Sequence, residues 1–261
     1  MKTPTAFSGA DIQALYAKIA QARAQAAASA PADETEQEAA PIDPAKAERA
    51  DLFARRYAIL RKALPWVSQP KACSISSYVC ECPDQEKAVR VCQRFADRLL
   101  DRVLDGRAAT GILLVGKPGT GKTHLARGIL CNLAAQGAPG FFIPATEFFD
   151  LYTPSFGAQL DVPLWKVREL LSGISCLVLD DVGTSAWTDA RRDRLQQVLD
   201  SRIAAGLPTV ITTNLGKQDF ADENASRISS RMSQYLFPLA CKWTDWREKT
   251  AAKRFSPEEL F

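Results

Sequence analysis

The segment Gly116–Thr123 constrains the fold of this chain more than any other feature. It reads GKPGTGKT and matches the pattern G-x-x-x-x-G-K-[ST], in which glycines let backbone N–H groups turn inward around phosphate oxygens. An apolar run, Thr110–Val115, precedes the segment, and a helical pattern, Lys122–Gln136, follows it. A strand, a glycine-rich loop and a helix in this order predict a phosphate-binding loop at the positive end of that helix.

The residue types in this loop predict how a nucleoside triphosphate would be held. Lys122 can neutralise the β- and γ-phosphates, and the hydroxyl of Thr123 can coordinate Mg²⁺. His124 is the single histidine of the chain, and we expect it to pack in the first helical turn rather than to act chemically. The residues predicted to contact the nucleotide are Gly116, Lys117, Pro118, Gly119, Thr120, Gly121, Lys122, Thr123 and His124.

Polar residues follow two later apolar runs. Asp180 and Asp181 come directly after Cys176–Leu179, and Asn214 ends the run PTVITTNL. We expect Asp180, with Thr123, to hold Mg²⁺, and Asp181 to polarise an attacking water. Asn214 is expected to orient that water or to sense the γ-phosphate. The simpler alternatives are a solvated turn for the two acids and a helix cap for the amide.

Short apolar runs alternate with helical patterns from residue 70 onward, and residues 83–106 form an amphipathic pattern. Continuous apolar runs separated by helices are typical of a mainly parallel sheet covered on both faces, which is an α/β fold. The predicted strands are Thr110–Val115, Gly140–Pro144, Ile174–Asp180, Thr209–Thr213 and Tyr235–Cys241. The predicted helices between them are Lys122–Gln136, Glu147–Tyr152, Leu164–Leu171 and Ala190–Ala204.

The first 69 residues differ in composition from the rest of the chain. The pattern predicts a helix with one apolar face over 8–29, an acidic linker over 28–44 and a basic amphipathic helix over 45–64. We therefore expect residues 1–69 to form a helical partner-binding region and residues 70–261 to form a nucleotide-binding domain. The alternative is that both helices fold back on that domain.

Composition excludes several other classes of protein. The formal net charge of +3 is too small to indicate nucleic-acid binding by itself, and no apolar run approaches the length of a membrane span. The amino-terminal residues lack the apolar core of a signal peptide, so we expect a cytoplasmic protein. The seven cysteines lack paired C-x-x-C spacing, which favours free thiols over a zinc site.

These motifs resemble those of AAA+ ATPases of the DnaC/IstB group. GKPGTGKTHLA, LVLDDVG, TVITTNL and RISSRM are similar to the phosphate loop, acidic strand, sensor and arginine box of that group. CSISSYVCECPDQEKAV and ACKWTDWR resemble further segments of DnaC-type helicase loaders. The resemblance, which covers residues 46 to about 250, implies a P-loop AAA+ three-layer parallel sheet. Because 30 residues follow Arg231, we expect no full helical lid.

The resemblance implies catalytic roles for two arginines besides Asp181 and Asn214. Arg231 matches the arginine finger, which reaches ATP bound to a neighbouring subunit, although Arg227 is a rival for this role. Arg247 matches a second sensor arginine. Most AAA+ proteins carry Asp-Glu on the acidic strand, whereas here the shorter Asp181 replaces the glutamate. Because catalytic geometry tolerates little misplacement, we expect slow, partner-stimulated ATP hydrolysis.

The same resemblance implies an ATP-dependent loader that delivers a replicative DnaB-type ring helicase to DNA during replication initiation. Its expected partners are the helicase, held through residues 1–69, single-stranded DNA, and further copies of the chain across ATP-binding interfaces, but no membrane. An IstB-like ATPase that binds DNA and regulates transposition is the first alternative. A P-loop nucleotide kinase is the second, although it would need no arginine box. The KWTDWR ending and the extra amino-terminal region favour the loader.

Overall fold

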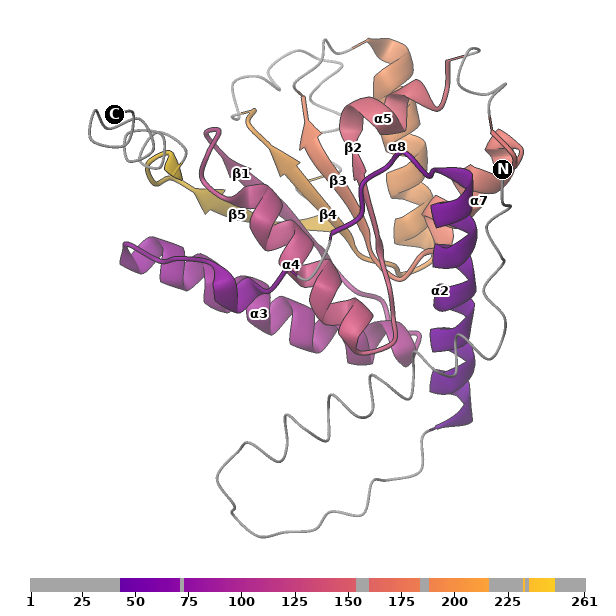
Figure 1. Cartoon of the computed structure of the whole chain (residues 1–261), viewed down its shortest axis with the longest axis horizontal. Coiled ribbons are helices and arrows are strands. Elements are labelled where there is room, and N and C mark those ends of the chain that lie inside the picture. Colours follow the sequence, from indigo (N-terminus) through magenta and orange to yellow (C-terminus); the bar gives the residue numbers. More distant parts are fainter. Residues whose placement is uncertain are drawn as a thin grey trace, which may run out of the picture.

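The computed structural model describes residues 43–70, 73–153, 160–183, 188–215, 232 and 235–246 (Figure 1). Before the sheet come α2 (Pro44–Ala63), a 3₁₀ turn η1 (Ile75–Ser77) and α3 (Pro83–Leu104). The remaining elements are β1 (Gly111–Gly116), α4 (Lys122–Ala135), β2 (Phe141–Pro144), α5 (Ala145–Asp150), α7 (Leu164–Gly173), β3 (Leu177–Val182), α8 (Asp189–Ala204), β4 (Thr209–Thr213) and β5 (Leu236–Cys241). All five predicted strands are confirmed, with bounds shifted by a few residues.

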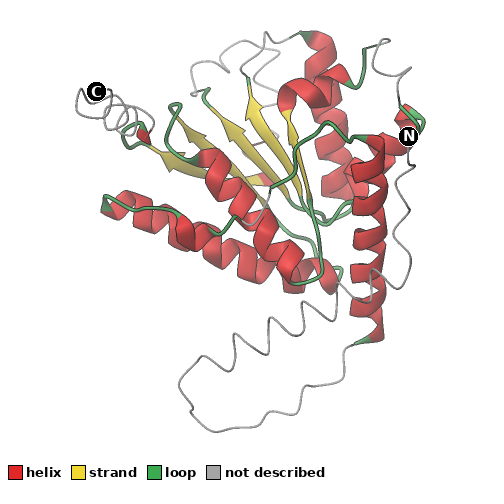
Figure 2. Ribbon diagram, viewed as in Figure 1, coloured by secondary structure: helices red, strands yellow, loops and turns green. Residues whose placement is uncertain are grey.

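The five strands form one parallel sheet in the order β2-β3-β4-β1-β5. β1 therefore lies between β4 and β5, with Ile112 opposite Val210 on one side and opposite Phe237 on the other. In a parallel sheet the carboxyl ends of all strands lie at the same edge, which is where ligands bind in α/β folds. The loop between β1 and α4 lies at this edge (Figure 2).

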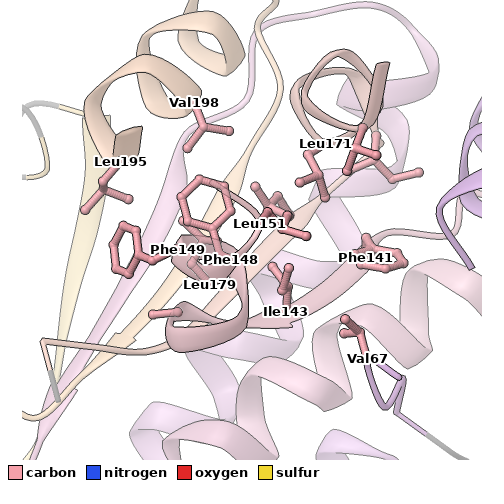
Figure 3. Close-up of a cluster of buried hydrophobic side chains, with 14 of the residues drawn as sticks. Val67, Phe141, Ile143, Phe148, Phe149, Leu151, Leu171, Leu179, Leu195 and Val198 are labelled. Carbon is pink, nitrogen blue, oxygen red and sulfur yellow. The ribbon is translucent and has the colours of Figure 1, made fainter. Parts of the chain in front are cut away.

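Apolar side chains of the strands alternate between two buried clusters, one on each face of the sheet. Phe141 and Ile143 of β2 pack on the face covered by α2, α5, α7 and α8, whereas Phe142 packs on the face covered by α3 and α4. Figure 3 shows the first cluster, in which Phe148 and Phe149 of α5 lie beside Leu179 of β3. The molecule is thus the three-layer α/β fold that the apolar runs predict.

The basic helix α2 is packed into this body. Its residues Leu60 and Ala63 belong to the cluster with α7, and Phe53 belongs to the cluster with α3. Arg56 also donates a hydrogen bond to the carbonyl of Gly173 at the end of α7. α2 therefore fits the alternative in which the basic helix folds back on the nucleotide-binding domain.

The rest of the amino-terminal prediction is not tested by the structure. The predicted helix 8–29 and nearly all of the linker 28–44 lie outside the described residues, as does the chain beyond Trp246. A domain boundary between residues 69 and 70 remains a prediction. No helix in the described part is long and apolar enough to cross a lipid bilayer.

A buried arginine, Arg202, connects α7, α8 and β4 at the end of the sheet opposite the phosphate loop. Arg202 of α8 is fully buried and donates from Nε to Thr209 Oγ1 at 3.0 Å. Its Nη1 donates to the carbonyls of Leu171 at 2.8 Å and Ile174 at 3.0 Å, and its Nη2 donates to Pro208. Burial lowers the pKa of Arg202 to about 10. One side chain thereby fixes the end of α7 and the start of β4 relative to α8.

Candidate nucleotide-binding site

A cavity of about 640 Å³ opens where β1, β3 and β4 end, beside the first turn of α4. It is lined by the phosphate loop and the start of α4, by the ends of β3 and β4, by the segment before α3 with the first turn of that helix, and by the segment after β5. The lining residues are Ser77, Tyr78, Val79, Gln85, Pro118, Gly119, Gly121, Lys122, Thr123, His124, Arg127, Asp180, Asp181, Thr212, Asn214, Trp243 and Trp246. Most of the predicted site residues that the structure describes therefore share one cavity.

The phosphate loop has a backbone shape that requires glycine. Gly119 and Gly121 have φ angles of +73° and +79°, which disfavour any residue with a Cβ. A Cβ on Gly121 would lie 2.5 Å from the ring of Tyr78. Lys122 lies over the loop, because its Nζ donates to the carbonyls of Gly116 and Lys117 at 2.7 Å each. This arrangement fits a phosphate chain cradled by backbone N–H groups and a lysine.

Asp180 is joined to both neighbouring elements by hydroxyl groups. Thr123 Oγ1 of α4 donates to its two carboxylate oxygens at 2.9 and 3.1 Å, and Thr212 Oγ1 of β4 donates to Oδ1 at 2.7 Å. Burial raises the pKa of Asp180, and the two hydroxyl donors oppose that shift. A hydroxyl and a carboxylate in contact are the oxygen ligands that Mg²⁺ uses beside nucleotide phosphates, so Thr123 and Asp180 fit this ion.

The strand β3 does not end at Asp180, as the sequence predicts, but continues to Val182 through an irregularity. Its pairing with β4 shifts between Leu179 and Val182, and Asp181 has a φ of +60°. The amide of Asp181 donates to Thr212 Oγ1 at 2.8 Å instead of joining the regular ladder. In a regular strand, consecutive side chains point to opposite faces. The shift allows both Asp180 and Asp181 to line the cavity, as β-bulges near active sites often do.

The amide of Asn214 meets the second acid of the pair. Its Nδ2 donates to Oδ1 of Asp181 at 3.0 Å, directly after β4 ends. This contact brings together two of the residues to which the sequence assigns catalytic roles. The alternative role of Asn214 as a helix cap involves residues after 215, which lie outside the described ranges, so it is not tested.

The sequence does not predict the aromatic side chains that hold the phosphate loop from outside. Tyr78 Oη and Trp243 Nε1 both donate to the carbonyl of Thr120, each at 2.8 Å, and the amide of Trp246 donates to the carbonyl of Gly119 at 3.0 Å. Burial raises the pKa of Tyr78 to about 12, so this phenol remains a donor at neutral pH. Tyr78 lies in the stretch CSISSYVCECPDQEKAV, and both tryptophans lie in ACKWTDWR. The resemblance of these stretches to helicase loaders was the only sequence signal for the aromatic side chains.

His124, in the first turn of α4, packs against the segment before α3. Its Nε2 lies 3.2 Å from the carbonyl oxygen of Ser74 and 3.2 Å from Ser77 Oγ, and the Tyr78 ring meets it edge-on. Although His124 lines the cavity, a direct contact with nucleotide remains a prediction. Arg227, Arg231 and Arg247 lie outside the described residues, so their roles also remain predictions.

The cysteines of the described part are free thiols. Cys92, Cys176 and Cys241 are buried in the apolar cluster beneath α3 and α4, and Cys80 is exposed. Within the described ranges, no group of three or more His, Cys, Asp or Glu side chains is arranged to hold a metal ion.

Comparison with known proteins adds family information to this geometry. The sequence pattern of the family described as IstB-like ATP binding protein matches residues 85–226. The replicative helicase loader DnaC of Escherichia coli (strain K12) is 24% identical over 185 residues, covering 70% of this chain and 72% of the relative. The crystal structure of DnaI superposes with a TM-score of 0.53 at 25% identity, covering 67% of this chain and 90% of that one. A crystal structure of the DnaC helicase loader shares the fold, with a TM-score of 0.55 at 22% identity, covering 64% and 96%.

Proposed function

From the premise that this chain belongs to the family of IstB-like ATP-binding proteins, we propose that it is an ATP-driven loader of a replicative ring helicase. The contact between Thr123 and Asp180 carries the nucleotide part of the proposal, because it joins the phosphate loop to the acidic strand. When bound there, Mg²⁺ would offset the negative charge of the phosphates. Thr123 and Asp180 would hold this ion, while Lys122 and the loop amides would hold the phosphate chain.

Asp181 is assigned the role of polarising the attacking water, with its carboxylate oriented by Asn214. Because Asp181 is shorter than the glutamate usual in AAA+ proteins, hydrolysis by the isolated chain is slow, and partners stimulate it. Arg231 is assigned the role of a finger that reaches ATP in a neighbouring copy, and Arg247 that of a second sensor. Assembly of copies would therefore complete each site.

The likeness to DnaC and DnaI supports the loader over other ATPases, because the relative's own name is that of a replicative helicase loader. Helicase contact is assigned to residues 1–42, since α2 is already packed into the ATPase body. Single-stranded DNA is the second expected partner. The rival function is an IstB-like DNA-binding regulator of transposition, which the family match favours equally.

Nucleotide binding is tested by replacing Lys122 with Ala and titrating a fluorescent ATP analogue. We expect loss of measurable binding, because the loop would lose its cation. Lys87→Ala is the matched control, since Lys87 is exposed on α3 and does not line the cavity. Unchanged affinity in the Lys122 variant would refute the phosphate-loop assignment.

The loader and the rival function are separated by capture of a purified DnaB-type helicase. We expect the full chain to capture the helicase, and a form lacking residues 1–42 to lose capture while still binding ATP, because α2 remains in place. Changing Ile12, Leu15 and Ile19 together to Ser should have the same effect. If the full chain fails to capture helicase but binds DNA, the rival function is correct. If the shortened form captures helicase at full affinity, the ATPase body makes the contact.

A further inference from the structure

Arg127 lines the nucleotide cavity and lies one helical turn after Thr123 on α4. Its Nε is buried without a hydrogen-bond partner, and its guanidinium forms no hydrogen bond or ion pair with any residue of the described ranges. The described contact of the cation is with the ring of Phe142, whose centroid lies 4.5 Å from the guanidinium carbon. A cation–π contact holds the charge in place without using the N–H donors.

Arg127, which is partly buried, differs in this respect from the fully buried Arg202. Arg202 donates from all three of its nitrogens to oxygens of neighbouring residues. Buried donors are almost always hydrogen-bonded, because an unpaired one loses its bond to water without replacement. The donors of Arg127 thus remain available for a ligand that enters the cavity.

The position of Arg127 indicates which part of a ligand it would meet. Residues four apart share a helix face, so Arg127 lies on the same face of α4 as Thr123, and long helical side chains lean toward the helix amino terminus. Both trends direct it toward the phosphate loop on the side of Asp180. This is the side of the loop where the terminal phosphate would lie, since Thr123 and Asp180 form the proposed metal site.

We propose that Arg127 is a cation supplied by the same chain to the terminal phosphate of bound ATP. The proposal rests on the assignment of this cavity as an ATP site. The loop amides would hold the phosphates that ATP and ADP share, and Lys122 would contact both the β- and the γ-phosphate. Arg127 would contact only the phosphate that ADP lacks. Arg127 would then help a single copy to distinguish ATP from ADP, beside Asn214 and Arg247, before any neighbouring copy adds an arginine.

The test compares two ligands on the full-length protein: fluorescent ADP and a fluorescent, non-hydrolysable ATP analogue, both with Mg²⁺. In Arg127→Gln we expect affinity for the analogue to fall about 10-fold to 100-fold, as for loss of a charged hydrogen bond, while ADP affinity changes less than about 2-fold. Arg127→Lys keeps a cation and should recover part of the analogue affinity. Arg98→Gln, an exposed position on α3, is the control and should change neither affinity.

Three results would overturn the inference. Equal weakening of both nucleotides in Arg127→Gln would mean that Arg127 only shapes the cavity. Unchanged binding of the analogue would mean that it does not touch the terminal phosphate. No recovery in Arg127→Lys, with melting temperature preserved, would mean that charge is not the cause. If the unaltered protein binds neither nucleotide, the ATP site itself is wrong, which is a distinct outcome.

Discussion

Asn214 Nδ2 donates a hydrogen bond to Oδ1 of Asp181 at 3.0 Å, and so joins the end of β4 to the irregular part of β3. The bond fixes the orientation of the Asp181 carboxylate, whose side chain is one methylene shorter than that of a glutamate. The backbone amide of Asp181 also donates a hydrogen bond to Thr212 Oγ1 of β4. The two strands therefore set the position of the proposed catalytic acid together.

Asp181→Asn is expected to preserve ATP binding and to reduce hydrolysis about 100-fold or more, because the amide cannot polarise water as a carboxylate does. Asparagine also tolerates a positive φ, so the backbone should keep its shape. Phosphate release in single-turnover assays measures the change. Asn214→Ala should act through the same carboxylate, so adding it to Asp181→Asn should cost little more. Hydrolysis by Asp181→Asn at the parental rate would contradict the assignment.

Arg231 is expected to act on ATP bound to a neighbouring copy. Arg231→Ala and Lys122→Ala should each hydrolyse little ATP alone, because one lacks the finger and the other lacks nucleotide. A mixture of the two should regain part of the activity, since one kind of mixed interface has an intact loop and an intact finger. The assay needs conditions that promote assembly, with helicase or DNA present. No recovery at any mixing ratio would indicate that Arg231 acts within its own chain.

Nucleotide binding is expected to change the fluorescence of the tryptophans beside the phosphate loop. Trp243 donates to Thr120 and Trp246 lines the cavity, whereas Trp165 is 65% exposed on α7 and does not line it. Changing Trp243 and Trp246 together to Phe should remove most of the emission change that ATP causes. Trp165→Phe is the matched control and should leave that change intact. If Trp165→Phe removed the emission change and the double variant kept it, the segment 242–246 after β5 would not respond to the nucleotide.

Arg202→Met is expected to lower the free energy of unfolding by about 3–5 kcal/mol. The substitution keeps most of the buried volume but leaves several carbonyl groups and a threonine hydroxyl without donors. Denaturant unfolding followed by circular dichroism measures the loss. Arg90→Met removes an exposed arginine that pairs with Glu86 and should change stability by less than about 0.5 kcal/mol. Equal effects of the two would show that Arg202 stabilises no more than a surface charge.

Thiol reactivity is expected to separate the cysteines by burial. Burial raises the pKa of Cys92, Cys176 and Cys241 to about 12, so these thiols are almost wholly protonated near pH 8 and are shielded as well. Exposed Cys80 should react first with a colorimetric disulfide reagent. The three buried thiols should react only after unfolding, and faster as pH rises, because more thiolate forms. Mass spectrometry identifies the labelled sites. Labelling of Cys176 in the native state would contradict the packing of β3.

The sheet and its helices were predictable because their signals are local. The run Cys176–Leu179 is apolar at every position, which indicates a strand buried between two helical layers. The phosphate loop carries its own pattern of glycines. Bounds shifted where long-range pairing sets an element's limits, as in β3, which begins three residues later than predicted and extends two residues further along its pairing with β4.

The finer geometry of the site depends on residues that lie far apart in sequence. Tyr78 and Trp243 donate to the same carbonyl, although Trp243 is 123 residues from Thr120. No local pattern relates them. In the sequence, Arg202 resembles the other charged residues of the polar helix α8, and only the fold shows that it is buried. Arg127 had a usable signal, namely its spacing of four residues from Thr123, but an arginine on a helix is more often a solvated charge.

The start of α2 has a consequence for how a partner can act on this protein. Asp43 accepts a hydrogen bond from the amide of Ala45, and Pro44 occupies the first helical position. A proline there cannot continue a helix from the preceding residues, because it lacks an N–H and disfavours helical backbone before it. A partner that grips residues 1–42 therefore cannot turn α2 as a continuous lever. Exchanging those residues between relatives should redirect the choice of partner while the nucleotide cycle continues unchanged.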